Sequence, residues 1–506
     1  MFDVFELPVF LQKTFSKKEV WLIFLLICLY FITRLINLEK FPIFTDEGIY
    51  IHWAKIAWHD ASWRFISLTD GKQPLQTWGT IPFLKFFPNN PLLAGRLFSV
   101  STGFIALVGV FTLLNFLFGK KAALYGSFFY IFTPYFLFYD RMALVDSALN
   151  AGFIWIFFFS ILLARSLRLD VALLSGAVFG ISMLAKSSVK MFVGLSIFAP
   201  LLFFSGKDRK TFKKKLVNFI VLYAVAVLIA LVIYNVQRLS PFLHFVAEKN
   251  KTFVMTFGQF MATPFRVVFS NLTLIPIDIL WESAFILPLI GVAGLLTLAM
   301  KNRRLFSYFL VWILVPYLLL SVFAIVVYPR YLIFFASLFL FLSSYFISIQ
   351  KNKNVLKALL IFYIASVLYF DFTILFAPKL IPFPPVDREQ YIESVSAGWG
   401  VKEIISFARE KSRQKPTILL AEGNFGVVGD MLEGSLGRDD KITVRGYWPL
   451  TKENLLDNQK ELQDHNVYVI FSHRNEFPPD LPVKFIQRFI KPGGQSSFYL
   501  FELTLR

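Results

Sequence analysis

The chain alternates long apolar runs with short polar segments, and eleven of the runs are long enough to cross a bilayer. A membrane-spanning helix needs about 20 predominantly apolar residues. The runs lie at 20–37, 92–118, 122–138, 148–164, 171–186, 189–205, 216–234, 278–300, 305–327, 331–349 and 357–377. We therefore expect a polytopic α-helical membrane protein with about eleven spans, which occupy residues 1–380.

Lys and Arg gather in short clusters before the first run and after every second run from there on. If all eleven runs cross, every cluster lies on the N-terminal side, which the positive-inside rule identifies as cytoplasmic. The N-terminus is then cytoplasmic, and the segments 38–91, 139–147, 187–188, 235–277, 328–330 and beyond about 378 lie outside. The clusters are Lys13, Lys17 and Lys18; Lys120 and Lys121; Arg165 and Arg168; Lys207, Arg209, Lys210, Lys213, Lys214 and Lys215; Lys301, Arg303 and Arg304; and Lys351, Lys353 and Lys357.

Composition agrees with a plasma or inner membrane protein. Of the 506 residues, 56% are hydrophobic and only 17% are charged, which excludes an ordinary soluble globular protein. The net charge of +18 would suit nucleic acid, but the cations cluster between apolar runs, so we expect no nucleic-acid partner. The single cysteine, Cys28, forms no internal disulfide.

Residues 381–506 differ from the rest, because the long apolar runs end and the charge density rises. Helical periodicity at 401–414 and 453–465 alternates with short apolar stretches typical of strands. Those stretches are 417–421, 442–446, 467–471 and 497–503. We expect a soluble extracytoplasmic α/β domain that covers the mouth of a site or binds an acceptor.

The external segment 38–91 begins with two carboxylates, Asp46 and Glu47, directly after the first run. Ile49, Trp53 and Ile56 follow at helical spacing and predict an amphipathic helix along the outer membrane surface. Asp46 is placed to act as a general base or to orient a nucleophile. The alternative is helix capping, with Asp46 at the N-cap and Glu47 at the positive end of the dipole.

Other polar residues fall on the same side. Arg330 lies between two apolar runs, where a phosphate would offset its charge, and Lys72 offers a second cation. The alternative for Arg330 is a snorkelling interfacial residue. The loop that holds Asp140, Arg141 and Asp146 has a simpler interpretation: Asp140 and Arg141 neutralise each other and Asp146 caps the next helix.

Four elements together resemble a known family. They are Asp46-Glu47, Lys72-Gln-Pro-Leu75, the loop from Asp140 to Asp146, and Pro329-Arg330-Tyr331. Over roughly residues 20–380 the chain resembles the membrane glycosyltransferases of C-type fold, and within them the group of protein mannosyltransferases and lipid A aminoarabinose transferases. Lys72 is followed by Gln73, where close relatives often have proline.

The resemblance implies an inverting glycosyltransferase, which moves a hexosyl or pentosyl group from a polyprenyl-phosphate donor, such as a dolichyl-phosphate-mannose-like lipid, to a protein, lipid or glycan acceptor outside the membrane. It implies that Asp46 is catalytic with Glu47 in support, and that Lys72 and Arg330 bind the donor phosphate. It also implies that four further residues organise the site: Asp140, Arg141, Asp146 and Tyr331. No cofactor is expected; the scattered histidines give no zinc signature, and a divalent metal stays open.

The main alternative is a transporter or flippase of a lipid-linked sugar. Such a protein carries charges near the centres of its spans and an internal repeat. Here the charges lie at one end of the spans, and no repeat is found. The pattern favours a transferase.

Overall fold

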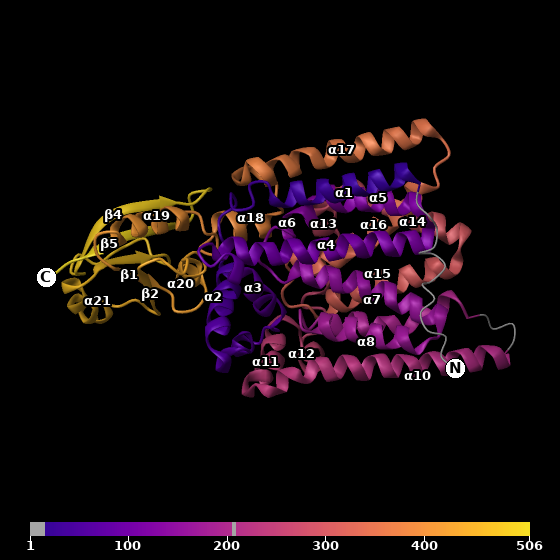
Figure 1. Ribbon diagram of the computed structural model, residues 1–506, viewed down its shortest axis with the longest axis horizontal. Helices are drawn as coiled ribbons and strands as arrows, with labels where there is room; N and C mark the ends of the chain where they lie inside the picture. Colours follow the sequence, from indigo (N-terminus) through magenta and orange to yellow (C-terminus); the bar gives the residue numbers. More distant parts are fainter. Residues whose placement is uncertain (1–15, 205–208, 506) are drawn as a thin grey trace.

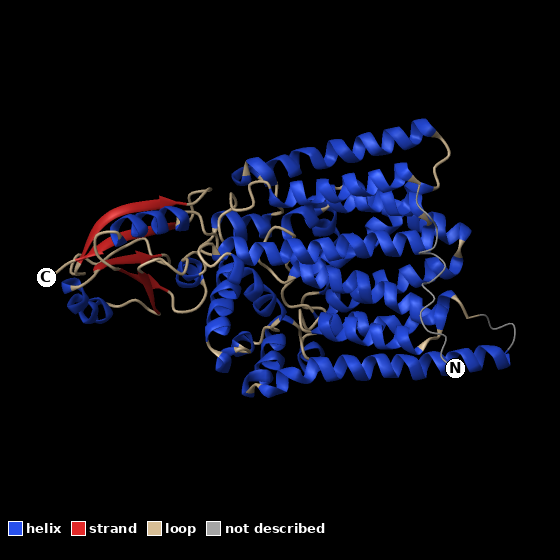
Figure 2. Ribbon diagram, in the orientation of Figure 1, coloured by secondary structure: helices blue, strands red, loops and turns tan. Residues whose placement is uncertain are grey.

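The computed structural model describes residues 16–204 and 209–505, which form a helical bundle with a small sheet domain at one end (Figures 1 and 2). The bundle helices are α1 (Lys17–Leu35), α4 (Pro91–Phe118), α5 (Lys120–Phe132), α6 (Pro134–Tyr139), α7 (Asp146–Ser166), α8 (Leu169–Met183), α9 (Val189–Leu195), α10 (Arg209–Tyr234), α13 (Val268–Glu282), α14 (Ile286–Lys301), α15 (Arg303–Phe323), α16 (Ile333–Ser348) and α17 (Lys353–Phe376). The junction helices are α2 (Thr45–His59), α3 (Leu75–Phe86), α11 (His244–Phe253), α12 (Phe257–Ala262) and α18 (Pro385–Arg388).

Six helical segments of the described chain are long and apolar enough to cross a membrane, or seven if one bent pair counts as a span. The expected eleven spans are therefore not confirmed, and their number stays a prediction. The run 122–138 is divided at Pro134 between α5 and α6, and 171–186 becomes α8, of only 15 residues. The run 189–205 is divided into α9 and the 3-10 helix η3 (Ser196–Leu202), and its last residue lies outside the described part.

The run 278–300, predicted as one span, is divided between two helices. It begins inside α13 and continues into α14, and the chain bends by 111° between the two helices. Ala284 and Phe285 have positive φ angles of 51° and 65°, which no continuous helix accommodates. The segment 235–277, predicted as a loop, holds α11, α12 and most of α13.

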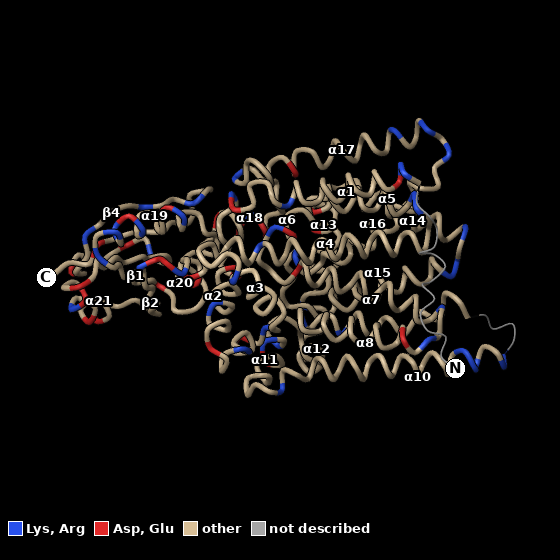
Figure 3. The backbone as a smooth tube through the Cα atoms, viewed as in Figure 1, with Lys and Arg blue, Asp and Glu red and all other residues tan. Residues whose placement is uncertain are grey.

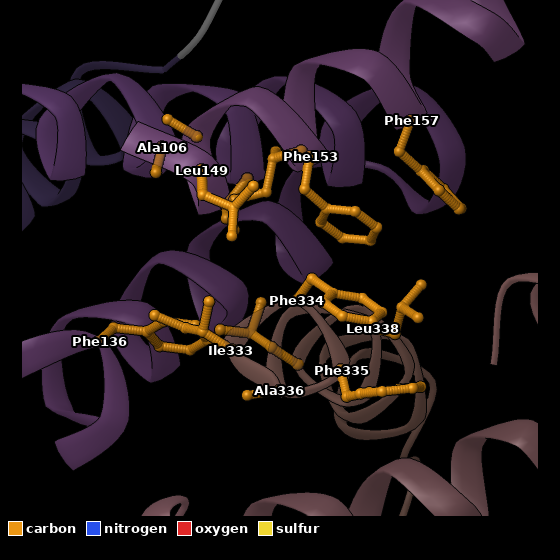
Figure 4. Close-up of a cluster of buried hydrophobic side chains, with 14 of the residues drawn as sticks. Ala106, Phe136, Leu149, Phe153, Phe157, Ile333, Phe334, Phe335, Ala336 and Leu338 are labelled. Carbon is orange, nitrogen blue, oxygen red and sulfur yellow. The ribbon is translucent and has the colours of Figure 1, made fainter. Parts of the chain in front are cut away.

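Aromatic side chains fill the centre of the bundle between α7 and α16, as Figure 4 shows. The rings of Phe153 and Phe334 have centroids 5.5 Å apart, and Phe157 meets the buried Trp312 edge to face at 4.9 Å. Tilted and edge-on contacts suit the aromatic quadrupole better than a face-to-face sandwich. This packing holds fixed the helices whose ends carry the polar residues described below.

The sheet domain has five strands in the order β2-β1-β3-β5-β4. Strands β1 (Thr417–Glu422), β2 (Ile442–Tyr447), β3 (Asn466–Phe471) and β5 (Ser497–Leu503) confirm the four predicted ones. Strand β4 (Val483–Ile490) is an addition, at an edge and largely exposed. Helices α19 (Val401–Ser412) and α20 (Val427–Glu433) cover one face, and α21 (Lys452–Asn458) packs on the other.

Helix α2 lies across the end of the bundle, between the long helices and the sheet domain (Figure 1). Its predicted helicity is confirmed. The helix packs beneath α20: a Cβ on Gly48 would stand 2.7 Å from the carbonyl carbon of Asp430. Its place along the outer membrane surface stays a prediction. Lys55 donates to the carboxylate and the carbonyl of Glu433, and ties the same two helices.

Basic residues gather at the end of the bundle away from the sheet domain, while charges of both signs meet at the junction (Figure 3). Lys13 and Lys207 of the predicted clusters lie outside the described residues. The one-sided distribution agrees with the sequence argument. Which end faces the cytoplasm stays a prediction.

Candidate active site

Asp46 does not cap its helix. The first turn of α2 is closed by Glu47, whose Oε2 accepts from the backbone N–H of Phe44 at 3.0 Å. The Asp46 carboxylate accepts instead from Lys72 Nζ at 3.2 Å and Arg330 Nη1 at 2.8 Å. The capping alternative for Asp46 is therefore wrong, and three residues far apart in sequence form one centre.

A tight turn places Lys72. The 3-10 helix η2 (Ile66–Asp70) ends at Gly71, whose φ of 65° favours glycine. Lys72 follows with its Nζ 3.4 Å from Asp70 and 5.2 Å from the centre of the Tyr50 ring. Asp70 in turn pairs with Lys249 of α11 at 2.7 Å, so the centre continues into a row of alternating charges.

Arg330 enters the centre from the opposite side, on the 3-10 helix η6 (Pro329–Leu332) that leads into α16. Its guanidinium lies among three aromatic rings, those of Phe44, Tyr328 and Tyr331, at 5.4 to 5.6 Å from their centroids. The Arg330 Nε is buried and has no hydrogen-bond partner. Arg330 thus has an N–H donor without a partner, at Nε, beside Nη1, which already donates to Asp46.

The electrostatics of the centre keep Asp46 ionised. Burial by itself raises the pKa of the Asp46 carboxyl, but Lys72 and Arg330 outweigh burial and hold that pKa well below its usual range. Burial likewise lowers the pKa of Lys72, and Asp46 foremost among its neighbours raises it above the usual value. About a fifth of each side chain, 21% and 20%, remains accessible, so both charges can meet a ligand.

A second ion pair adjoins this centre through Tyr331. Asp146, in the first turn of α7, accepts from Lys186 Nζ at 3.1 Å, and the same ammonium lies 3.8 Å from the centre of the Tyr331 ring. Asp146 makes no capping hydrogen bond. Lys186 was not predicted as a site residue; its place at the outer end of an apolar run was the available signal.

Glu47 lies in a separate, closed centre. Both its oxygens accept from Arg96, at 2.9 and 2.8 Å, and Oε1 also accepts from the Ala143 N–H at 2.6 Å. The side chains of Glu47 and Arg96 are fully buried. Arg96 was missed because it lies within a long apolar run, on a helix whose other residues indicate only a span.

Asp140 and Arg141 do not neutralise each other. Asp140 pairs with Arg34 at 3.2 Å and accepts from Ser147 at 2.8 Å. Arg141 donates to the carbonyls of Thr33, Arg34 and Asn37 at the end of α1. Both residues fasten α1: the last carbonyls of a helix lack partners within it, and Arg141 supplies donors to them. Among the described hydrogen bonds and ion pairs, none joins either residue to Asp46.

The described residues contain no group of three or more His, Cys, Asp or Glu side chains arranged to hold a metal ion. The centre around Asp46 is instead a carboxylate between two cations. Such an arrangement is suited to bind an anionic oxygen group that competes with Asp46 for the same donors.

One family model matches part of the chain. Residues 72–234 match the model of the family described as dolichyl-phosphate-mannose-protein mannosyltransferase. No curated protein sequence matches the chain.

Solved structures match over most of the chain. ArnT from Cupriavidus metallidurans, bound to undecaprenyl phosphate, is 14% identical with a TM-score of 0.60, over 96% of this chain and 97% of its own. The Archaeoglobus fulgidus oligosaccharyltransferase in its apo form is 12% identical with a TM-score of 0.54, over 90% and 69%. The oligosaccharyltransferase AglB from the same organism, with an inhibitory peptide and a dolichol-phosphate, is 14% identical at 0.51, over 90% and 69%. The family-model match and the shared architecture confirm the resemblance predicted from the sequence: the chain has the C-type fold of the membrane glycosyltransferases.

Proposed function

We propose that the chain is an inverting glycosyltransferase, which moves a sugar from a polyprenyl-phosphate donor to an acceptor at the extracytoplasmic face of the membrane. The observation that carries this proposal is the Asp46 carboxylate held between Lys72 and Arg330, with part of each charge accessible. The undecaprenyl phosphate of ArnT and the dolichol-phosphate of AglB are ligands of those proteins, and they support a lipid monophosphate as donor here.

The two cations have a direct role in such a reaction. The bond between the sugar C1 and the phosphate oxygen breaks, and its electron pair stays on the polyprenyl phosphate. Lys72 and the fork of Arg330 stabilise that charge as it develops. The acceptor hydroxyl forms the new bond at C1 from the opposite face, which inverts the configuration.

Asp46 receives or orients the acceptor's proton in this scheme. In the structure its two cations make it a weak base, because they favour the ionised form. A bound phosphate shares those cations and thereby raises the proton affinity of Asp46. Donor binding thus prepares the base, and an empty site leaves it inactive.

Turnover tests the proposal directly. Purified protein in detergent, given synthetic polyprenyl-phosphate sugars, is expected to release free polyprenyl phosphate and a glycosylated product. Mass spectrometry of lipid-linked sugars and glycans from a deletion strain identifies the natural sugar and acceptor. Translocation of a lipid-linked sugar with its bond intact would instead establish a flippase, an alternative to which the comparisons lend no support.

The proposed face of the membrane has its own test. Cysteine labelling at Gln414 and at Lys210, in a variant that lacks Cys28, is expected to reach the two positions from opposite sides of intact membranes. Labelling of both from the same side would overturn the assignment of the sheet domain to the outside and of the N-terminus to the cytoplasm.

A further inference from the structure

The loop between β1 and α20 presents an aromatic ring that the fold leaves open. Asn424 and Phe425 are exposed, and 47% of the Phe425 surface is accessible. One side of the ring rests on Trp53 of α2, with centroids 6.0 Å apart and planes inclined by 29°. We call residues 423–426 the tip loop.

The tip loop is fixed to the helix that carries Asp46. A Cβ on Gly426 would lie 3.4 Å from the Thr45 methyl group and 3.7 Å from Ile49, so the loop passes over the first turns of α2. Asp430 accepts from the Gly426 N–H and contacts His52 Nδ1 at 2.5 Å. Phe425 therefore has a set position relative to the candidate active site.

A row of aromatic rings connects the tip loop with Lys72. The Lys72 ammonium lies 5.6 Å from the Trp53 ring centre, and Trp53 meets Tyr50 edge to face at 5.9 Å. Phe425 is the outermost ring of this row. A sugar bonded directly to a phosphate on Lys72 lies beside that lysine, and Phe425 lies one aromatic ring further along the row, where a second sugar can meet it.

We propose that Phe425 and Asn424 bind a sugar ring of the acceptor, which makes the acceptor a saccharide or glycoconjugate. The C–H face of a pyranose carries partial positive charge and packs on the negative face of an aromatic ring. An adjacent amide supplies both a donor and an acceptor for the sugar hydroxyls. The role of this sugar as the acceptor rests on the proposed function. The binding of a sugar at Phe425 does not.

Saturation-transfer NMR with the full chain in lipid nanodiscs tests the binding without turnover. The probes are methyl α-mannopyranoside, methyl β-glucopyranoside, methyl arabinopyranoside and an uncharged tripeptide. At least one glycoside is expected to show transfer to its ring C–H protons. Phe425→Ala is expected to weaken that signal about three- to tenfold, the range typical of an aromatic contact.

Matched variants distinguish a contact with the aromatic face from an effect of side-chain size alone. Phe425→Leu keeps an apolar side chain and is expected to lose the signal as Phe425→Ala does, whereas Phe425→Trp retains it. Phe485→Ala removes another exposed ring, 54% accessible on the edge strand β4, and is expected to leave the signal unchanged.

Three results would overturn the inference: no glycoside signal, a glycoside signal that survives Phe425→Leu, or a tripeptide signal that depends on Phe425. Asp46→Asn is expected to keep the glycoside signal. A chain with a Phe425-dependent signal but no transfer would contradict the proposed reaction and leave the sugar site standing.

Discussion

Asp46 and Glu47 are adjacent carboxylates on one helix, yet their surroundings differ in kind. Glu47 is fully buried and satisfied by Arg96 and two backbone N–H groups. Asp46 is shared between two cations, keeps a fifth of its surface accessible, and adjoins an arginine nitrogen without a partner. The comparison teaches that a closed ion pair holds a fold, whereas an open one is available for exchange with a ligand.

The largest expected effect falls on the closed pair. Glu47→Gln leaves the buried Arg96 charge uncompensated, which costs about 3–5 kcal/mol and lowers the melting temperature sharply. Glu19→Gln is the matched control, because its pair with Lys120 is a quarter exposed and screened by solvent, so it contributes little to stability. A Glu47→Gln protein that melts like the parent but has no turnover would show that Glu47 takes part in the reaction. That result would contradict the difference drawn between Glu47 and Asp46.

The open pair is expected to show the opposite behaviour. Asp46→Asn keeps the shape of the side chain but neither takes up a proton nor holds both cations. Turnover of a polyprenyl-phosphate sugar should therefore fall roughly 100-fold or more, with the melting temperature near that of the parent. Near-normal turnover would remove Asp46 from the mechanism, even for a chain that proved to be a glycosyltransferase.

Substitution of Arg330 tests the Asp46 ion pair through its cation. Arg330→Ala is expected to weaken donor affinity about tenfold or more, the range of a charge-assisted hydrogen bond. Arg330→Lys should lose less, because it keeps the charge and loses only the planar fork. Titration of polyprenyl phosphate against both variants measures the difference; equal affinities to the parent would exclude Arg330 from the phosphate site.

A third carboxylate, that of Asp387, forms none of the described salt bridges, and Arg330 only partly offsets its burial. Asp387 of α18 accepts from the Tyr139 hydroxyl at 2.7 Å, and burial raises the pKa of its carboxyl to about 7. The unfolded chain releases this proton near pH 3.9. The folded state therefore holds an extra proton between about pH 4 and 7, so the stabilisation is complete below pH 4 and is lost as the pH rises to 7.

Asp387→Asn tests that dependence with the smallest expected effect. Between pH 5 and pH 8, the melting temperature of the parent should fall by more than that of the variant, because the variant has no carboxyl proton at position 387 to lose. Thermal unfolding in detergent at the two pH values gives both slopes. Parallel slopes would mean that Asp387 is ionised in the fold, as Asp46 is.

How far the sequence predicts this molecule depends on the range of each interaction. Strands such as β1 and β3 are apolar segments between turns, so local pattern identifies them, whereas the exposed edge strand β4 lacks that pattern. The meeting of Asp46 with Lys72 and Arg330 follows from a shared side of the membrane. The pairing of Arg34 with Asp140 spans 106 residues and depends on how α1 packs, which no local pattern indicates.

The bend between α13 and α14 illustrates a different limit. Apolarity continues across it, so the sequence predicts one spanning run, while two residues with positive φ lie where the chain bends by 111°. Hydropathy reports the surroundings of a segment and says nothing of its direction. Glu282, the last residue of α13 before the bend, interacts with Asp387.

The crossing of α2 and α20 joins the helix of the candidate active site to the sheet domain. Gly48 meets the backbone of Asp430 so closely that a methyl group has no room, and Gly434 approaches Gly48 from the same side. The helix that bears Asp46 is thereby locked to the sheet domain as one body. Because Glu47 on the same helix is joined to Arg96 of α4, a shift of the sheet domain against the bundle would act directly on the turn that carries Asp46.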